Sequence, residues 1–320
     1  MKPTNALLLT ALLCGLSPLT FSQPYPSKAV VIIVPYAPGG ITDVVGRQTA
    51  AALGERWKQS VLVDNRPGGG TIVGTAAAAK AAPDGYTLLL TSFGFTTNQI
   101  LISDLPYDPA ALAPVTLVGT APNVLYVHPS VPARTPKEVI DYAKSRPKGI
   151  LLASSGNASS PHIAAELFAS LTGIEMTHVP YKGTGPAMID VLGGRVHGIF
   201  DTMQSMPYAK SGKLRVIAVA NSKRLSTAQD LPTFAEFGIP QLISASWFGF
   251  FVPARTPPEI QKKVYDDVRS ILAPADMREK IVQAGLEPAS MTREEFTAFL
   301  DSELKKWGHV IRTRNIKLEP

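Results

Sequence analysis

The sequence predicts an α/β protein of two lobes, and three observations lead to this fold class. Short apolar runs bounded by turn residues alternate with segments of helical period, which is typical of mostly parallel sheets flanked by helices. The chain has 320 residues, more than a single hydrophobic core usually serves. Two long extended runs, at residues 115–128 and 247–254, are expected to be crossover strands that carry the chain between the lobes.

The first 22 residues have the pattern of a secretory signal peptide. An apolar run over residues 6–16 follows a basic residue, and residues 20–22 offer a small-x-small cleavage site. Pro18 closes this run well before the about 20 apolar residues that a membrane-spanning helix needs. Cys14 follows a large residue, which argues against a lipid anchor, and it is the only cysteine. A mature chain without a thiol suits an oxidising compartment and must depend on apolar burial for its stability.

The first lobe is predicted to comprise residues 23–122 together with residues 249–320. A helix from Ile41 to Trp57 is expected to pack on a sheet of buried strands. The strands are expected at residues 29–34, 60–65 and 86–92. The apolar residues expected on the inner side of the helix are Ile41, Val44, Val45, Leu53 and Trp57.

Residues 123–248 are predicted to form the second lobe. Its first helix is expected to begin at Thr135-Pro136-Lys137-Glu138, which supplies an N-cap, a proline at the first helical position and a glutamate at the third. Gly173 is expected to end a helix over residues 161–172. The remaining elements are expected as strands at residues 149–155, 176–181, 198–201 and 215–220 and as a helix that starts at Pro186.

The C-terminal residues are expected to return to the first lobe and pack on it. One helix is predicted to be capped by Thr256-Pro257-Pro258-Glu259, and a later one by Thr292-Arg293-Glu294-Glu295, which has the pattern of a capping box. An apolar stripe at helical spacing follows, which indicates a helix that packs on a core. The stripe consists of Phe296, Phe299, Leu300, Leu304, Trp307 and Ile311.

Three loops place glycine or serine residues between a predicted strand and the helix after it. Such junctions combine unpaired backbone N–H groups with the positive end of a helix dipole, so they can bind anions. The first loop (residues 35–43) contains Pro38-Gly39-Gly40 before Thr42 and Asp43. The second loop (residues 154–162) contains Ser160 as the expected N-cap, Pro161 at N1 and His162 at N2. The third loop (residues 181–186) contains Gly183-Thr184-Gly185 before Pro186.

The first loop belongs to one predicted lobe, and the second and third loops belong to the other. Ligands of open α/β sheets bind at the carboxyl ends of strands, and clefts between lobes are common ligand sites. We therefore expect the loops to face each other and hold a small anion, which the net charge of +6 would attract. A structural alternative stays open at each loop, because glycines make turns and aspartates such as Asp43 and Asp190 favour helix N-termini.

The sequence gives little support to nucleotide, nucleic-acid or metal binding. A GxxxxGK[ST] motif is absent, and residues 66–74 match a dinucleotide fingerprint only with the last glycine displaced by one position. The basic residues are dispersed, which argues against a nucleic-acid partner. The five histidines lack metal-binding spacing, so neither a metal nor a cofactor is expected.

Catalysis finds equally little support. Ser155, His162 and Asp201 form a hydrolase triad only by selection among many serines, and no GxSxG motif accompanies them. We expect His162 to be a neutral hydrogen-bonding group in the wall of the site, with a purely structural role as the alternative. Asp201 is expected to orient the loops, to accept a hydrogen bond from a ligand hydroxyl or amine, or simply to act as a cap. Phe93 and Phe95 are expected either to pack in the core or to favour an apolar or aromatic acid.

Six segments, in this order, resemble successive motifs of the Bug-type (TctC-like) solute receptors of tripartite tricarboxylate transporters. They are "YPSKAVVIIVPYAPGGITDVVGR", "VDNRPGGGTIVGT", "PDGYTLLL", "LASSGNASSPHIAAELF", "HVPYKGTGPAMIDVLGGRV" and "SWFGFFVPARTP". Together they extend over nearly the whole mature chain. The resemblance implies a two-lobed periplasmic binding protein (type II-like) that closes on carboxylates through loop amides and bridging waters, without enzymatic activity.

The resemblance also implies a set of ligand-binding residues. They are Tyr36, Gly39, Gly40, Thr42 and Asp43, then Ser92, then Ser155, Asn157, Ser159, Ser160 and His162, and finally Tyr181, Gly183 and Asp201. Three positions depart from the family pattern: His197 stands where an acid is common, Thr202 follows Asp201 where an asparagine is usual, and Phe95 stands where a histidine often lies. These departures leave the expected fold unchanged and the ligand open.

The function implied by the resemblance is capture of a small organic carboxylate in the periplasm. A di- or tricarboxylate, an amino acid or an aromatic acid would fit this description. The receptor would present its ligand to the membrane permease subunits of the transporter. A sensor kinase that binds the closed, liganded form is an alternative partner.

Overall fold

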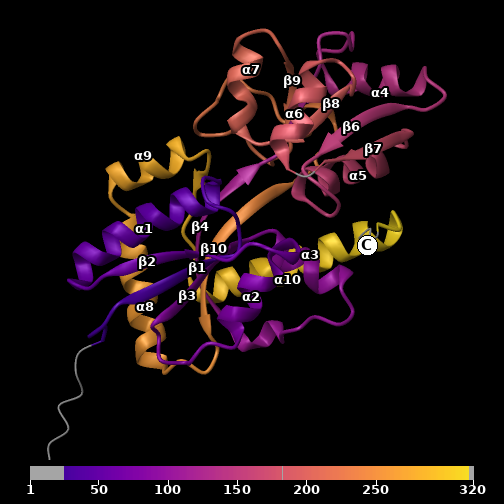
Figure 1. The fold of residues 1–320 in the computed structure, drawn as a ribbon. Helices are drawn as coiled ribbons and strands as arrows, with labels where there is room; N and C mark the ends of the chain where they lie inside the picture. The colour runs from indigo at the N-terminus through magenta and orange to yellow at the C-terminus, as the bar shows by residue number, and fades with distance from the viewer. Residues whose placement is uncertain (1–24, 182, 317–320) are drawn as a thin grey trace, which may run out of the picture.

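The computed structural model describes residues 25–181 and 183–316, and it divides them between two lobes (Figure 1). The predicted signal peptide lies outside the described residues. The first lobe contains β1 (Val30–Val34), α1 (Ile41–Trp57), β2 (Val61–Asn65), α2 (Ile72–Ala79), β3 (Thr87–Ser92), α3 (Gly94–Leu101), β4 (Leu112–Pro122), β10 (Ala245–Pro253), α8 (Pro258–Leu272), α9 (Ala275–Gln283), β11 (Glu287–Pro288) and α10 (Arg293–Thr313).

The second lobe is built around a separate sheet. It contains β5 (Val124–Val127), α4 (Pro136–Lys144), β6 (Ile150–Ser154), α5 (Ser160–Thr172), β7 (Met176–Pro180), α6 (Thr184–Leu192), β8 (Gly198–Asp201), α7 (Met206–Lys210) and β9 (Arg215–Val219). Short 3-10 helices lie at Gly69–Thr71 and Pro109–Ala111 in the first lobe and at Met203–Ser205 and Phe234–Phe237 in the second. The predicted two-lobed α/β fold is therefore confirmed.

The strand orders are β11-β4-β10-β3-β1-β2 in the first sheet and β7-β6-β8-β5-β9 in the second. Strand β1 pairs in parallel with β2 and β3, and β6 pairs in parallel with β7 and β8. The crossover strands β10 and β5 pair antiparallel with both of their neighbours. The sheets are mixed because each crossover strand arrives from the other lobe at the carboxyl ends of the parallel strands. It therefore runs in the opposite direction to those strands.

The two crossings lie side by side at the junction of the lobes. Asn123 separates β4 from β5, and its amide donates to the carbonyl of Ser244 at 2.9 Å, just before β10. The amide of Ala220 donates to the carbonyl of Asn123 at 2.7 Å. Because Ala245 pairs with Pro122 in the first sheet, we propose that the second lobe extends over residues 123–244, four residues less than predicted.

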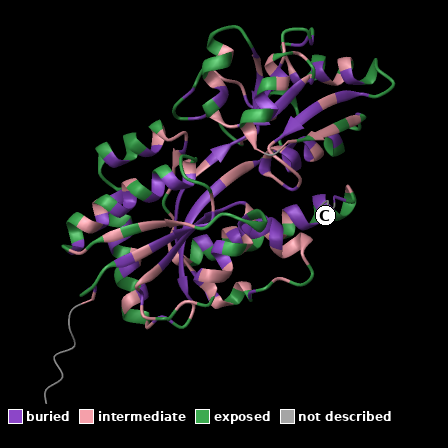
Figure 2. Cartoon of the chain, viewed as in Figure 1, coloured by how far each residue is buried: buried purple, intermediate pink, exposed green. Residues whose placement is uncertain are grey.

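Helices cover both sheets, and the central strands form the buried interior, whereas the edge strands β2 and β7 are only partly buried (Figure 2). Helix α8 packs on α1, where the Asp267 carboxylate accepts from Arg56 and from the indole N–H of Trp57, both at 2.6 Å. Helix α10 contacts α3 and β4 of the first lobe, but it also reaches α5 of the second, where Arg314 pairs with Glu166 at 2.8 Å. The predicted packing of the C-terminal helices on the first lobe is confirmed, and α10 in addition spans the two lobes.

The apolar stripe of α10 is part of the core, as predicted. Phe296 and Trp307 are fully buried, and Leu300 and Ile311 are nearly so. The capping box at the start of the helix is present as well: the Thr292 hydroxyl accepts from the Glu295 amide at 3.1 Å, and the Glu295 carboxylate accepts from the Thr292 amide at 2.8 Å. Among the described residues, no helix is long and apolar enough to cross a membrane.

Several local predictions were wrong. Val44 is 36% exposed instead of buried, because the inner side of α1 is formed by small and polar residues such as Thr42, Gly46 and Thr49, which an apolar pattern does not reveal. Helix α8 has Pro257 as its N-cap, without a side-chain cap from Thr256. Helix α6 begins at Thr184, two residues before the predicted start at Pro186.

Candidate functional site

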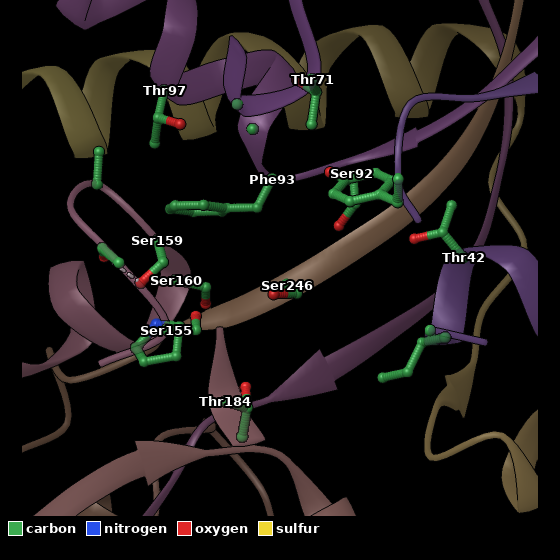
Figure 3. A pocket seen from close by; sticks show the side chains of 18 of the residues that line it. Thr42, Thr71, Ser92, Phe93, Thr97, Ser155, Ser159, Ser160, Thr184 and Ser246 are labelled. Carbon is green, nitrogen blue, oxygen red and sulfur yellow. Dashed lines mark hydrogen bonds between the residues drawn. The ribbon is translucent and has the colours of Figure 1, made fainter. Parts of the chain in front are cut away.

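A cavity of about 470 Å³ lies between the lobes, where the parallel strands of both sheets end. Its lining residues directly follow β1, β3, β6 and β8 along the chain, for example Tyr36, Phe93, Ser155 and Thr202. In Figure 3, Thr42 and Ser92 of the first lobe lie on one side, and Ser155, Ser159 and Ser160 of the second lie on the other. The carboxyl ends of strands from both lobes therefore meet at this cavity, as predicted.

The predicted site residues divide into those that line this cavity and those that do not. The lining group consists of Tyr36, Gly40, Thr42, Ser92, Ser155, Asn157, Ser159, Ser160 and Asp201. The other group consists of Gly39, Asp43, His162, Tyr181 and Gly183, which are absent from the lining and lie behind it in the same loops or beside them. The second group supports the loops through contacts described below.

The first loop is held in place by Asp43, whose carboxylate is almost fully buried. It accepts from the backbone amide of Gly39 at 2.9 Å, and Arg47 approaches its second oxygen at 2.9 Å. Burial opposes ionisation of this carboxyl, but the hydrogen bonds from Arg47 and Gly39 outweigh it and hold the pKa of Asp43 below its usual range. Arg47 in turn donates to Asn65 at 3.0 Å. Asp43 therefore fixes the loop without lining the cavity.

The start of α1 presents backbone donors to the cavity. Gly40 is the N-cap, and no side chain caps this helix end. The first amides of a helix have no partner within the helix, so those of Ile41 and Thr42, which line the cavity, are available to an anion. Gly40 has an ordinary φ of −79°, and a Cβ placed there would meet only the carbonyl oxygen of Ala37, at 3.9 Å. The glycine thus keeps the approach to these amides open instead of relieving strain.

Helix α3 adds a second helix N-terminus on the same side, which sequence reasoning missed. Its N-cap is Phe93, and both Phe93 and Gly94 line the cavity. Burial raises the pKa of the nearby Tyr36 phenol to about 12, so this hydroxyl stays protonated and can donate. The segment "GFTTNQIL" has few apolar residues and no polar N-cap. It therefore lacks the pattern by which helices are recognised in a sequence.

The second loop is held by hydrogen bonds between uncharged groups. Ser159 is the N-cap of α5, in place of the predicted Ser160, and its hydroxyl also donates to the carbonyl of Gly156 at 2.7 Å. The Ser154 hydroxyl accepts from the Gly156 amide at 3.1 Å. Ala158 has a φ of +58°, a strained value for a residue other than glycine. Its conformation is held by its amide, which donates to Nδ1 of His162 at 3.0 Å.

His162 is absent from the cavity lining and supports the second loop, which agrees with the structural alternative for this residue. It lies at the third helical position, not the second, and its ring stacks on that of His178 with centroids 3.6 Å apart. Its Nε2 lies 3.6 Å from a carboxylate oxygen of Glu166. Although burial opposes it, the hydrogen bonds from His162 and Arg314 hold the pKa of Glu166 below its usual range. Both ring nitrogens of His162 thus face groups other than Ser155, so His162 is not placed to act as a general base for Ser155.

The third loop contributes less to the cavity than predicted. Thr184, at the start of α6, lines the cavity, whereas Gly183 donates its amide to the carbonyl of Ser155 at 3.1 Å and so ties the third loop to the second. The Tyr181 hydroxyl donates to Asp190 at 2.7 Å, and Arg195 donates to the same carboxylate at 2.7 Å. Tyr181 therefore orders the loop without lining the cavity.

Asp201 is the single carboxylate among the described residues of the lining. It lies at the end of β8, is 5% exposed, and accepts from the hydroxyl of Ser205 at 2.5 Å. Burial raises the pKa of this carboxyl. The described lining residues include no lysine, arginine or histidine, and they offer hydroxyls, carboxamides and backbone amides as polar contacts. In the described part of the chain, no cluster of three histidine, cysteine or acidic residues could hold a metal ion.

Several lining residues come from segments in which the sequence did not predict any site residue. Asn123 and Ser246 lie on the two crossings, and the Asn123 carboxamide donates to the hydroxyls of Ser160 at 2.7 Å and Ser244 at 3.0 Å. Asn123 thereby joins the second loop to the junction of the lobes. The other unmarked lining residues with polar side chains are Thr71, Thr97, Asn98, Thr202 and Gln204. They approach one another only in the folded chain, so no local pattern reveals them.

The chain is similar to a known family over most of its length. The family model described as the tripartite tricarboxylate transporter family receptor matches residues 45–316. Protein BugT of Bordetella pertussis is 34% identical over 309 residues, which are 95% of this chain and 95% of that protein. The family match includes both lobes and the second and third loops.

Solved structures of similar proteins have the same two-lobed architecture. R. palustris Rpa4515 with adipate has a TM-score of 0.82 at 34% identity, covering 92% of this chain and 100% of that one. The periplasmic binding protein BugD has a TM-score of 0.78 at 30% identity, with coverage of 92% and 100%. MatC from Rhodopseudomonas palustris with bound malate has a TM-score of 0.76 at 27% identity, with coverage of 90% and 100%.

Proposed function

The chain belongs to the tripartite tricarboxylate transporter receptor family, and from this premise we propose that it captures a small organic carboxylate between its lobes. It then delivers the acid to the membrane subunits of a tripartite transporter. The observation that carries the proposal is the cavity itself, into which uncapped helix starts and hydroxyls of both lobes project. Adipate and malate in the similar proteins support a carboxylate as the ligand.

The energetics of such a site are sufficient without a buried cation. A hydrogen bond to a charged group contributes roughly 1.5–3 kcal/mol. Micromolar affinity corresponds to about 8 kcal/mol. Four or five donors therefore suffice, and the amides of the first and second loops together with the lining hydroxyls can supply them.

The proposed place of action is the periplasm. The family consists of periplasmic receptors, and the N-terminal pattern of an apolar run followed by a small-x-small site supports export of this chain. Export is testable by expressing the full-length chain in a Gram-negative host. We expect the periplasmic fraction to contain a protein that begins near Gln23, as read by N-terminal sequencing.

Ligand capture is tested by a thermal-shift screen of the purified protein against di- and tricarboxylates, amino acids and aromatic acids. An acid present at 100 times its Kd stabilises the folded state by about 2.7 kcal/mol. This should raise the Tm by about 4 °C in a chain of this size. Isothermal titration calorimetry then gives the Kd. If no acid in the screen changes the Tm, the proposed function fails.

The role of the first loop is tested by Gly40→Val, with Gly185→Val as the matched control. Both glycines are exposed at a helix start and have room for a side chain, but only Gly40 lines the cavity. The valine at position 40 should crowd the carboxylate and weaken binding by about tenfold or more, with a stability change within about 0.5 kcal/mol. Gly185→Val should bind normally. Equal affinity in the two variants would remove the first loop from the site.

A further inference from the structure

We propose that Glu287 is a positioning residue of this receptor. It ends the turn that leads from α9 into β11 (residues 284–287), and this turn acts as a clamp that holds the second lobe in the arrangement in which both lobes line the cavity. The clamp lies outside the ligand site, because neither Glu287 nor the two residues that its carboxylate binds belong to the lining. The inference goes beyond the proposed function, and only the affinity test rests on that function.

The Glu287 carboxylate reaches from the first lobe to the second and accepts four hydrogen bonds there. One oxygen accepts from the amide and the hydroxyl of Ser226, at 3.2 and 2.6 Å. The other oxygen accepts from the amide and the hydroxyl of Thr227, at 3.4 and 2.5 Å. Each carboxylate oxygen thus has a pair of donors on the same turn of the second lobe. Paired bonds to a charged group fix the direction of a contact as well as its distance.

Both ends of this bridge are anchored in the core of their own lobe. In the first lobe, Leu286 is 2% exposed and packs in the core, and the neighbouring Glu287 pairs with Thr120 of β4. In the second lobe, Leu225 directly precedes Ser226, is 1% exposed and packs in the core of that lobe. The bridge therefore joins two packed cores and not two loosely held surface segments.

The same turn contacts a residue that lines the cavity. Gly285 has a φ of +92°, which favours glycine, and a Cβ placed there would lie 3.3 Å from Cγ of Gln204. Gln204 lines the cavity and lies in the 3-10 helix Met203–Ser205, whose Ser205 donates to Asp201. The glycine therefore lets the first lobe approach this helix closely, and the position of the clamp is transmitted to the cavity through Gln204.

The clamp lies beside the place where the chain crosses between the lobes. Glu287 pairs with Thr120, just before the crossing at Asn123. A second, smaller cavity of about 120 Å³ lies next to the clamp and is lined by both lobes, for example by Pro122 of the first and Met203 of the second. Apolar packing between the lobes is therefore incomplete at this place, and the hydrogen bonds of Glu287 provide the connection.

The first test needs no acid and measures the distance between spin labels on the two lobes. The only cysteine, Cys14, lies in the predicted signal peptide, so Glu55→Cys on α1 and Lys210→Cys on α7 provide specific attachment points at exposed positions. Double electron–electron resonance should give one narrow distance distribution, which becomes broader or longer when Glu287→Ala is added. The control Glu138→Ala removes an exposed carboxylate that accepts from a backbone amide within the second lobe, and it should leave the distribution unchanged.

The second test measures how the clamp affects acid binding. Calorimetry is performed with adipate or, if adipate is not bound, with the acid that raises the Tm most in the screen. Glu287→Ala should weaken binding by about fivefold, since a smaller fraction of the protein holds both lobes over the cavity. Ser226→Ala with Thr227→Ala should weaken binding to a similar degree, and the triple variant by less than the two losses combined, because one bridge is removed twice. Glu138→Ala should leave the Kd within about twofold.

Unchanged or tighter binding in Glu287→Ala, or fully additive losses in the triple variant, would show that the clamp does not position the lobes for binding. If the distance distribution changes but none of the screened acids binds, the clamp stands and the proposed function fails. If an acid binds and Glu287→Ala changes neither the distance distribution nor the Kd, the clamp is overturned while the proposed function stands.

Discussion

The first and second loops face each other across the cavity, yet they are held in place by different chemistry. The first loop depends on one buried carboxylate, Asp43, which bonds to the Gly39 amide and to Arg47. The second loop depends on neutral groups, chiefly Ser154, Ser159 and His162. Backbone amides can thus be fixed toward a ligand either by a charged group or by a network of uncharged hydrogen-bonding groups. The two loops should therefore respond differently to mutation and to pH.

The largest expected effect comes from Asp43→Ala. The variant loses the hydrogen bond to the Gly39 amide and the pairing with Arg47 inside the protein, which should cost roughly 2–4 kcal/mol of unfolding free energy. The loosened loop should also weaken acid binding by about tenfold. Urea unfolding and calorimetry measure the two quantities.

The matched control for this variant is Asp64→Ala. Asp64 also pairs with an arginine, Arg66, at 2.8 Å, but its side chain is 38% exposed and supports no loop of the site. Its removal should cost less than about 1 kcal/mol and leave binding unchanged. Similar losses in the two variants would mean that Asp43 acts as an ordinary surface charge.

A smaller effect is expected from acid, and it should arise at the second loop. Burial lowers the pKa of His178 to about 4, and this ring stacks on His162 and contacts the Ser154 hydroxyl at 2.6 Å. In the unfolded chain the pKa is about 6.5, so the unfolded state binds more protons between pH 6.5 and 4. Stability is therefore fully present above pH 6.5 and falls as the pH drops toward 4.

This loss should amount to about 1–2 kcal/mol at pH 5, after allowance for partial exposure of the ring. The measurement is the Tm of the wild type and of His178→Gln at pH 7 and pH 5. The variant should have a shallower pH dependence than the wild type. Identical pH profiles would show that His178 carries a proton as readily in the folded chain as in water.

The smallest effect is expected from Ser159→Ala, which removes the N-cap of α5. Loss of a serine cap costs about 1 kcal/mol. Thr135→Ala removes the equivalent cap of α4, away from the cavity, and provides the control. Both variants should lose similar stability, but only Ser159→Ala should also weaken acid binding, since Ser159 lines the cavity. Equal affinities would assign Ser159 to helix capping alone.

The sequence was sufficient where local patterns decide the structure. Helix α1 begins and ends at the predicted residues, and the N-cap at Thr135 and the capping box at Thr292 mark helix starts as expected. The glycine and serine loops were located correctly for the same reason. In contrast, Ser160 was taken as the cap of α5 instead of Ser159, because adjacent serines offer equivalent caps and only the folded loop selects one.

The remainder of the site could not be predicted because it depends on tertiary contacts. Asn123 and Ser246 reach the cavity from the two crossings, which are distant in sequence. The sequence places His162 at a helix start but cannot show that its ring turns away from the cavity toward His178 and Glu166. Phe93 and Phe95 are likewise ambiguous in sequence, and the fold places both rings in the core, at 4% and 5% exposure.

The most direct test of the account is a crystal structure of the protein with the acid from the thermal-shift screen that binds most tightly. We expect carboxylate oxygens within about 2.7–3.1 Å of backbone nitrogens from both facing loops, at Ile41 or Thr42 on one side and within residues 155–160 on the other. An acid held by one lobe alone, or bound outside the cavity between the lobes, would contradict it.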